Sequence, residues 1–217
     1  MTQQHDIIEN ARLADETEMG AVTLKVRDLD NMIKYYTEAL PLQVLAQEGA
    51  SAVIGRGNRP LVILGHAPEL QPASPRAAGL FHTAILFESE TALAAAVYSV
   101  AKYAPNTFTG SSDHLVSKAL YFNDPEGNGI ELYWDRDRSE WSWVHGQVEM
   151  DSLFLDPNQY LRDYLTEEAM QDPVIGGVSI GHVHLQVGDI AGAQKFYVDW
   201  LGFDATHANT PGALFVS

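Results

Sequence analysis

Cysteine is absent from the sequence and basic residues are scarce, and these two shortages narrow the chemistry before any motif is considered. Without cysteine there are no disulfides and no thiolate metal sites, so His, Asp and Glu are the only strong metal ligands. Lys and Arg number 13 against 29 Asp and Glu, which gives a formal net charge of −16 at pH 7. A chain this acidic repels phosphate backbones and anionic lipids, which argues against nucleic acid and membrane as partners.

Long apolar runs are missing as well. No segment approaches the roughly 20 apolar residues of a membrane-spanning helix. The N-terminal arm, residues 1–18, is polar and acidic and lacks the basic and apolar regions of a signal peptide. There is also no Gly-rich phosphate loop, no HExxH pair and no nucleophile elbow. We therefore predict a cytoplasmic protein, and its 217 residues, 46% of them hydrophobic, suit one large or two small folded domains.

Two distant segments of the chain repeat each other. Gly20 to Val44 aligns without a gap with Gly181 to Ala205, and eight of the 25 aligned pairs are identical. In the first copy, apolar residues alternate with polar ones from Val22 to Val26, which predicts a half-buried strand. Asp28 and Asp189 stand where each copy passes into a helical pattern, so we expect them to cap those helices. The repeat predicts a strand followed by a helix in both copies.

A third copy lies between these two. Leu80 to Ser89 is strand-like, Thr91 to Tyr103 is an Ala-rich helical pattern, and Lys118 to Asp135 is two strands around a Pro/Gly/Asn turn. A βαβββ module is therefore predicted to begin near residues 20, 79 and 179. The predicted domains are an N-terminal arm (1–18), an N-terminal domain (19–135, with modules 19–78 and 79–135), a linker with a short helix (136–178), and the first, incomplete module of a C-terminal domain (179–217).

The three modules, together with DPEGNGIEL at 124–132 and GHVHLQVGDIAGAQKFYVDWLGF at 181–203, resemble the vicinal-oxygen-chelate superfamily. This superfamily includes glyoxalases, bleomycin resistance proteins and extradiol dioxygenases, and the layout is most similar to two-domain bacterial catechol 2,3-dioxygenases. The resemblance implies an α+β fold of βαβββ modules, paired into open, curled mixed sheets that form a cup with helices outside. The third module stops at ALFVS, 213–217. We expect a fragment of a longer protein, with another chain supplying the missing surface as the alternative.

The function that this resemblance implies is an Fe(II)-dependent extradiol dioxygenase. Such an oxidoreductase cleaves the ring of a catechol-type aromatic diol with O2, in the catabolism of aromatic compounds. Two His and one carboxylate commonly hold non-haem Fe(II) and leave positions open for substrate and O2. Mn(II), Zn(II) and Ni(II) are the alternative metals. A homodimer is left open, and the function is expected to be incomplete in this chain.

Candidate site residues follow from the same resemblance. His182 takes the first-strand ligand position of the third module, and its partner His and carboxylate would come from a fourth module that the chain lacks. His184, two residues along the strand, shares its face and is expected to face the substrate or support the ligand. His82 and Glu131 stand at ligand positions of the second module, but Ala21 stands at the matching position of the first. This pair is therefore expected to be vestigial, and no further catalytic residue is assigned.

Two other functions remain open from the sequence. A glyoxalase-like lyase or isomerase would use Zn, Ni or Co with Glu131 as ligand or base, and would need a ligand from the first module. A non-catalytic binding protein of the same fold would hold a small molecule such as a cationic antibiotic in the acidic cup. A hydrogen-bonded structural role is the alternative for each candidate histidine. Other histidines, His66 and His114 among them, have no partner at ligand spacing.

Overall fold

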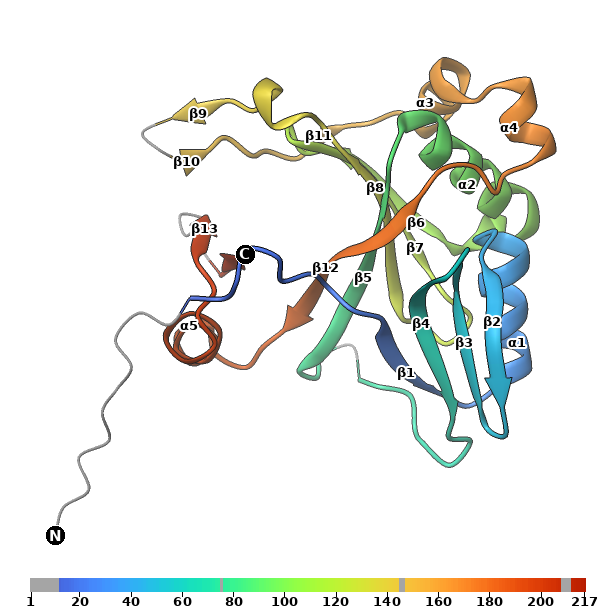
Figure 1. The fold of residues 1–217 in the computed structure, drawn as a ribbon, viewed down its shortest axis with the longest axis horizontal. Coiled ribbons are helices and arrows are strands. Elements are labelled where there is room, and N and C mark those ends of the chain that lie inside the picture. Colours follow the sequence, from blue (N-terminus) through green and yellow to red (C-terminus); the bar gives the residue numbers. More distant parts are fainter. Residues whose placement is uncertain (1–11, 75, 145–146, 208–211) are drawn as a thin grey trace, which may run out of the picture. The chain divides into compact units, whose positions relative to one another are not determined.

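The computed structural model describes residues 12–74, 76–144, 147–207 and 212–217 (Figure 1). The first part of the predicted arm, residues 1–11, lies outside this range. The strands are β1 (Val22–Val26), β2 (Gln43–Glu48), β3 (Ser51–Arg56), β4 (Arg59–His66), β5 (Gly79–Phe87), β6 (Phe108–Asp113), β7 (Ser117–Asn123), β8 (Gly129–Asp135), β9 (Trp143–Val144), β10 (Gln147–Val148), β11 (Leu153–Phe154), β12 (Val178–Gln186), β13 (Ala205–His207) and β14 (Phe215–Val216). The helices are α1 (Leu29–Lys34), α2 (Glu90–Tyr103), α3 (Pro157–Tyr164), α4 (Glu167–Gln171) and α5 (Ile190–Gln194), with π-helical turns η1 (Tyr35–Ala39) and η4 (Lys195–Trp200) and 3-10 turns η2 (Pro105–Thr107) and η3 (Arg138–Glu140).

The first two predicted modules form one sheet each, and the two sheets share a topology. The first sheet has the order β1-β4-β3-β2, and the second contains β5-β8-β7-β6 in the same relation. In each, the first strand of the module runs parallel to the fourth, and the remaining pairs are antiparallel. The prediction of an α+β fold with open, curled mixed sheets and helices outside is confirmed.

The helices begin where the sequence predicted. The Asp28 side chain accepts a hydrogen bond from the Asn31 N–H at 3.1 Å, and Asp189 accepts from the Gly192 N–H at 2.6 Å. Each carboxylate satisfies an amide that the first helical turn leaves unpaired. Both helices, α1 and α5, then pass into a π-helical turn, so the repeat extends to this irregularity.

One hydrophobic core joins both sheets to α1 and α2. On the second sheet, Ile85, Leu120 and Leu132 turn toward this core, and α2 packs its alanines and Leu93 against it. Burying a Leu, Ile or Phe side chain contributes about 1.5–3 kcal/mol each. The helices therefore cover one face of the six-stranded sheet, and among the described residues a small apolar cluster around Ala84, Ala119 and Tyr133 lies on its opposite face.

The Asp-Pro-Glu-Gly-Asn-Gly turn between β7 and β8 links the two modules. Glu126 accepts hydrogen bonds from the backbone N–H groups of Arg27 and Asp28, both at 2.8 Å, just before α1 begins. Asp124 is buried, accepts from the backbone N–H groups of Glu126 and Asn128 within the turn, and lies 3.4 Å from the Tyr36 hydroxyl. A turn of the second module thus supplies a capping carboxylate to the first.

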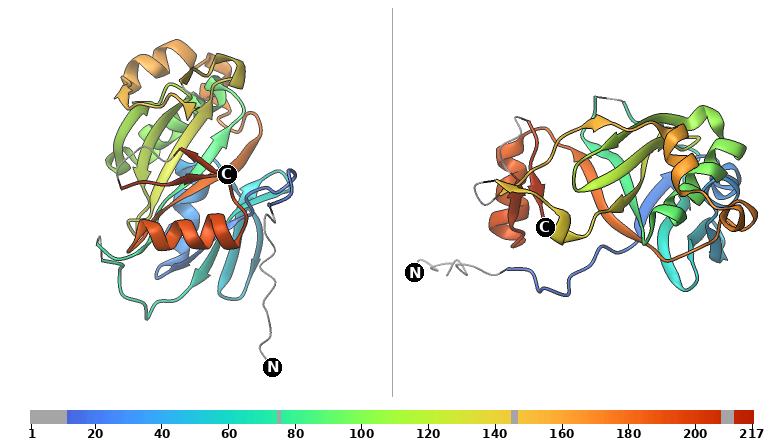
Figure 2. Two further views of the ribbon diagram at one scale, coloured as in Figure 1. Left: turned by 90° about the vertical axis from the view of Figure 1, so that its left-hand side faces the viewer. Right: turned by 90° about the horizontal axis from the view of Figure 1, so that it is seen from above.

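The linker region folds into two short helices, α3 and α4, where a single helix was predicted. Both pack against α2 (Figure 2). Asp156 caps α3 ahead of Pro157, which occupies a first-turn position that needs no N–H. The Lys118 ammonium on β7 donates to Glu90 of α2 and to the Tyr164 hydroxyl of α3, so a partly buried cation connects α3 to the sheet.

The chain divides into two compact units. The larger comprises residues 19–142 and 149–186, and the remaining described residues form the smaller. This division falls after Gln186, inside the third module (179–217), whereas the sequence predicted a domain boundary between residues 178 and 179. The predicted domain boundaries stay a proposal. Within the described residues, no helix is long and apolar enough to cross a membrane.

Candidate metal site

Strand pairing places three candidate ligands on one face of the six-stranded sheet. β12 lies beside β5 and pairs with it antiparallel (Figure 1). In this pairing, His182 lies opposite Ala84. β5 pairs parallel with β8, and there Ala84 lies opposite Glu131. Residues paired across strands share a face, and residues two apart on one strand do too, so His82 joins the same face. His182, Glu131 and His82 therefore project together from three adjacent strands.

The three side chains meet at a single carboxylate oxygen. Glu131 Oε2 lies 2.9 Å from His82 Nε2 and 3.2 Å from His182 Nε2. The ligand atoms of all three lie within 4.8 Å of one another. Glu131 and His82 are buried, with 4% and 7% of their surface exposed, whereas 46% of the His182 side chain is exposed. The cluster is thus closed on the side of the sheet and reachable from the side of His182.

Protonation of the cluster follows from its hydrogen bonds. Burial raises the pKa of Glu131, but hydrogen bonds from His182 and His82 outweigh burial and bring the pKa down to about 2. A carboxylate only accepts, so both Nε2 atoms carry a proton in this arrangement. His82 Nδ1 is buried and has no hydrogen-bond partner among the described residues. Leaving a buried polar atom unpaired costs about 1–3 kcal/mol.

The donor set fits a divalent transition metal. Two imidazole nitrogens and one carboxylate oxygen are the ligands of the facial site of non-haem Fe(II) oxygenases. Ligand atoms bound at about 2.1 Å and at right angles lie about 3 Å apart. The 2.9 Å and 3.2 Å separations match this spacing along two edges. The residues present could therefore hold such an ion with a small adjustment of the two rings.

A bulge in β12 turns the side chain of His182 toward this cluster. Ile180 pairs with Ile85 and His182 pairs with Ala84, so Gly181 is an extra residue without a partner. Ile180 faces the core, and the bulge turns His182 to the opposite face. A Cβ on residue 181 would stand 1.7 Å from the Tyr133 hydroxyl, so any other residue there would require the Tyr133 ring to move.

Tyr121 and His114 adjoin the cluster, and no pattern in the sequence pointed to either residue. Tyr121 pairs with Glu131 across β7 and β8 and so shares its face. Burial raises the pKa of Tyr121, and the nearby Glu131 carboxylate raises it further, so the phenol keeps its proton. His114 Nδ1 lies 3.0 Å from the Asp151 carbonyl and must donate to it, which leaves Nε2 to accept from the Tyr121 hydroxyl at 2.8 Å. To identify this pair from the sequence, one would have to know the register of β7 against β8.

His184 lies on the same face as His182, as predicted from their spacing. Its ring lies 4.9 Å from the His82 ring and 4.7 Å from the ring of Phe81, measured between centroids. Burial lowers the pKa of His184, and the two neighbouring histidines lower it further. An uncharged imidazole at the margin of the cluster can accept a proton from a ligand.

The structure differs from the sequence interpretation in how the candidates are grouped. That interpretation gave His182 partners in a fourth module and set His82 and Glu131 aside as a vestigial pair. In the structure the three lie together, because β12 adds to the edge of the second module's sheet beside β5. Ala21, which stands at the corresponding position of the first module, lies outside the cluster.

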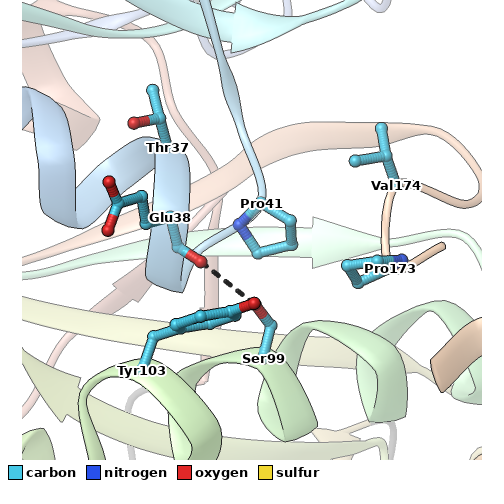
Figure 3. A pocket seen from close by; sticks show the side chains of 7 residues that line it. All are labelled: Thr37, Glu38, Pro41, Ser99, Tyr103, Pro173 and Val174. Atoms are coloured by element: carbon cyan, nitrogen blue, oxygen red, sulfur yellow. Dashed lines mark hydrogen bonds between the residues drawn. The ribbon is translucent and has the colours of Figure 1, made fainter. Parts of the chain in front are cut away.

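A separate pocket of about 380 Å³ lies on the helical side of the larger unit. Figure 3 shows its lining residues between η1, α2 and the segment that follows α4, with the Ser99 hydroxyl donating to the Glu38 carbonyl at 3.3 Å. None of the candidate ligands lines it. Its walls are mostly apolar, and it offers no grouping of titratable side chains comparable to the histidine–glutamate cluster.

Known proteins are similar to this chain in sequence and in fold. Residues 18–132 match the family described as the Glyoxalase/Bleomycin resistance protein/Dioxygenase superfamily. The Catechol-2,3-dioxygenase of Bacillus subtilis (strain 168) is 36% identical over 208 residues, which cover 94% of this chain and 71% of that protein. A glyoxalase/dioxygenase from Nostoc punctiforme aligns with a TM-score of 0.49 and 20% identity over 59% of this chain and 99% of that one. The cppA protein from Streptococcus pneumoniae TIGR4 aligns with a TM-score of 0.48 and 14% identity over 76% of this chain and 58% of that one.

Proposed function

Because the chain belongs to the glyoxalase/bleomycin resistance protein/dioxygenase superfamily, we propose that it is an Fe(II)-dependent extradiol dioxygenase that opens the ring of a catechol. The observation that carries this proposal is the convergence of His82, Glu131 and His182 on one point, with the donor set that oxygen-activating iron requires. The 36% identity to a catechol dioxygenase supports the same reaction class. The proposed setting is the breakdown of aromatic compounds in the cytoplasm.

In the proposed reaction, one catechol and one O2 give one ring-opened product. The carbon–carbon bond beside the diol breaks, both oxygen atoms enter the product as an aldehyde and a carboxylic acid, and no external reductant is consumed. The bound metal would supply positions for the diol oxygens and O2 and act as a Lewis acid. His82 and His182 would hold it through Nε2 and Glu131 through Oε2.

The surrounding residues would prepare the site for this chemistry. With its pKa lowered to about 2, Glu131 is a carboxylate at neutral pH and needs no deprotonation before it binds a cation. His184 can accept a proton from a diol hydroxyl, since its lowered pKa leaves the ring uncharged. Tyr121, hydrogen-bonded to His114, lies beside the Glu131 carboxylate and the His82 ring and would help to keep both in position.

Metal content tests this proposal directly. The protein is purified without oxygen, and bound metal is measured by elemental mass spectrometry in the wild type, His182→Ala and Glu131→Ala. His66→Ala is the matched control, because His66 bonds the Arg27 carbonyl and lies outside the cluster. We expect near-stoichiometric iron or manganese in the wild type and the control, and its loss in the two cluster variants. Circular dichroism shows whether each variant is folded.

The same measurement separates the alternatives. Iron together with uptake of one O2 per catechol supports the dioxygenase. Zinc or nickel without oxygen uptake would replace it with a glyoxalase-like lyase or isomerase. A folded wild-type protein that binds no metal after reconstitution would eliminate both enzymes and leave a small-molecule binding protein.

A further inference from the structure

A second bulge, in β5, brings an aromatic ring to the candidate metal site. His82 pairs with His184 and Leu80 pairs with Leu185, so Phe81 is an extra residue between them. In a regular strand the side chain of residue 81 would point away from that of residue 82. The bulge re-aims it, and the Phe81 ring lies 4.7 Å from the His184 ring and 5.5 Å from the His82 ring.

The neighbouring strand is shaped to accommodate this bulge. Gly129 on β8 pairs with His82, and a Cβ there would stand 2.2 Å from the Phe81 carbonyl oxygen. Any other residue at 129 would push the bulged backbone away from β8. The position of Phe81 is therefore built into two strands.

Phe81 is left half exposed, with 50% of its surface open. It stands beside the exposed side of the cluster, where His182 is also accessible, and the face around it contains the rings of Tyr121, Tyr133 and His184. An exposed aromatic ring next to candidate metal ligands offers a flat apolar surface to a bound molecule. The carboxylates of Glu131 and Asp135 lie near Tyr133 on this face, and Arg138 lies near Asp135.

Resting on the proposed function, we propose that Phe81 is a specificity-determining residue that packs against the ring of the bound diol. With the diol held at the histidine–glutamate cluster, the rest of the substrate ring extends over Phe81 and His184. An apolar substituent there gains contact with the phenyl ring. A carboxylated substituent meets the Glu131 and Asp135 carboxylates on this face, in a protein of net charge −16. The preferred substrates are catechols with an uncharged, apolar substituent.

Binding of two catechols without oxygen tests this inference. The 217-residue protein, loaded with Fe(II), is titrated by calorimetry with a methyl-substituted and a carboxyl-substituted catechol. In Phe81→Ala we expect the Kd for the methyl-substituted catechol to rise about tenfold and that for the carboxylated one to change less than about twofold. Phe108→Ala is the matched control, because Phe108 is 41% exposed on the same sheet and its ring contacts Phe122, a core residue.

Each outcome bears on a different claim. Unchanged affinity in Phe81→Ala, or an equal loss for both catechols, overturns the role of Phe81 and leaves the dioxygenase intact. Iron-loaded wild-type protein that binds neither catechol overturns the proposed function and this inference with it. Phe81→Leu keeps apolar bulk without the ring, and partial recovery of affinity there supports a contact with the substrate over a general change of the strand. Unaltered iron content in Phe81→Ala shows that the cluster itself is intact.

Discussion

Two imidazole nitrogens share one oxygen of Glu131, and this sharing sets the properties of the whole cluster. The carboxylate is 4% exposed, where a lone charge would be strongly disfavoured. Hydrogen bonds from the two histidines outweigh this cost of burial, because they stabilise the charged form of Glu131. A metal ion at the same point would take over this role and release the protons that the two Nε2 atoms carry.

The lowered pKa of Glu131 predicts an acid-dependent loss of stability in the metal-free protein. The carboxyl has a folded-state pKa of about 2 against an ordinary value of 4.5. Its stabilising contribution is therefore complete above about pH 4.5 and is lost as the pH falls toward 2. Glu131→Gln cannot titrate, so the difference in melting temperature between wild type and variant should shrink across this range. The exposed Glu140→Gln is the control, and parallel curves for wild type and Glu131→Gln would contradict the prediction.

At the scale of strands, the site depends on two single-residue bulges. Gly181 in β12 turns His182 to the cluster, and Phe81 in β5 brings its ring to the same face. Each bulge is matched by a close approach to a glycine, at Gly181 itself beside the Tyr133 side chain and at Gly129 beside the Phe81 carbonyl. The geometry of the cluster is thus encoded as much by two glycines as by the ligands.

Gly181→Ala should be both destabilising and harmful to metal binding. The added Cβ would stand 1.7 Å from the Tyr133 hydroxyl, and relieving such an overlap costs about 1–3 kcal/mol. Because the strand must shift, His182 should move from Glu131 and metal affinity should fall. Gly110→Ala is the control, since nothing lies within 4 Å of its added Cβ on the same sheet. Urea denaturation and metal titration measure both effects, and a Gly181→Ala protein that matches the control in both would rule this out.

Local pattern was enough to predict most elements of the fold. Alternation predicted β1, and the aspartates predicted the starts of α1 and α5, because each signal acts within a few residues. Because His182 and His184 are two residues apart on a predicted strand, the sequence also predicted that their side chains share a face. Which face they share, and which strand they adjoin, depended on pairing with β5 almost 100 residues earlier and on the bulge at Gly181. Strand pairing and bulges are set by tertiary structure, which the periodicity of the sequence does not encode. The sequence interpretation therefore placed His182 in a different site from His82 and Glu131, although the sheet brings all three together.

For the whole molecule, the charge of −16 on 217 residues is the dominant electrostatic feature. Like charges repel one another more strongly in the compact state than in the extended chain, so they lower stability. Lys118 shows one compensation, a cation held between Glu90 and the Tyr164 hydroxyl. Most of the remaining acidic excess lies at the surface and is open to screening.

Added salt should therefore stabilise this protein. Raising the ionic strength from about 0.01 M to 0.15 M shortens the screening length from about 30 Å to about 8 Å. If self-repulsion costs about 1 kcal/mol, the melting temperature should rise by about 2–4 °C. Sodium and potassium chloride should act alike at equal ionic strength, because screening does not depend on the cation. A melting temperature that stays constant or falls with salt would show that attractive ion pairs outweigh the acidic excess.

The carboxylate of Glu126 has a consequence for how the larger unit opens. It belongs to the turn between β7 and β8, yet it holds the amide protons of Arg27 and Asp28 at the entrance to α1. Those two protons can exchange with solvent only when contact with the second module's turn is broken. Hydrogen exchange at Arg27 and Asp28 therefore reports how often this contact between the two repeated modules opens.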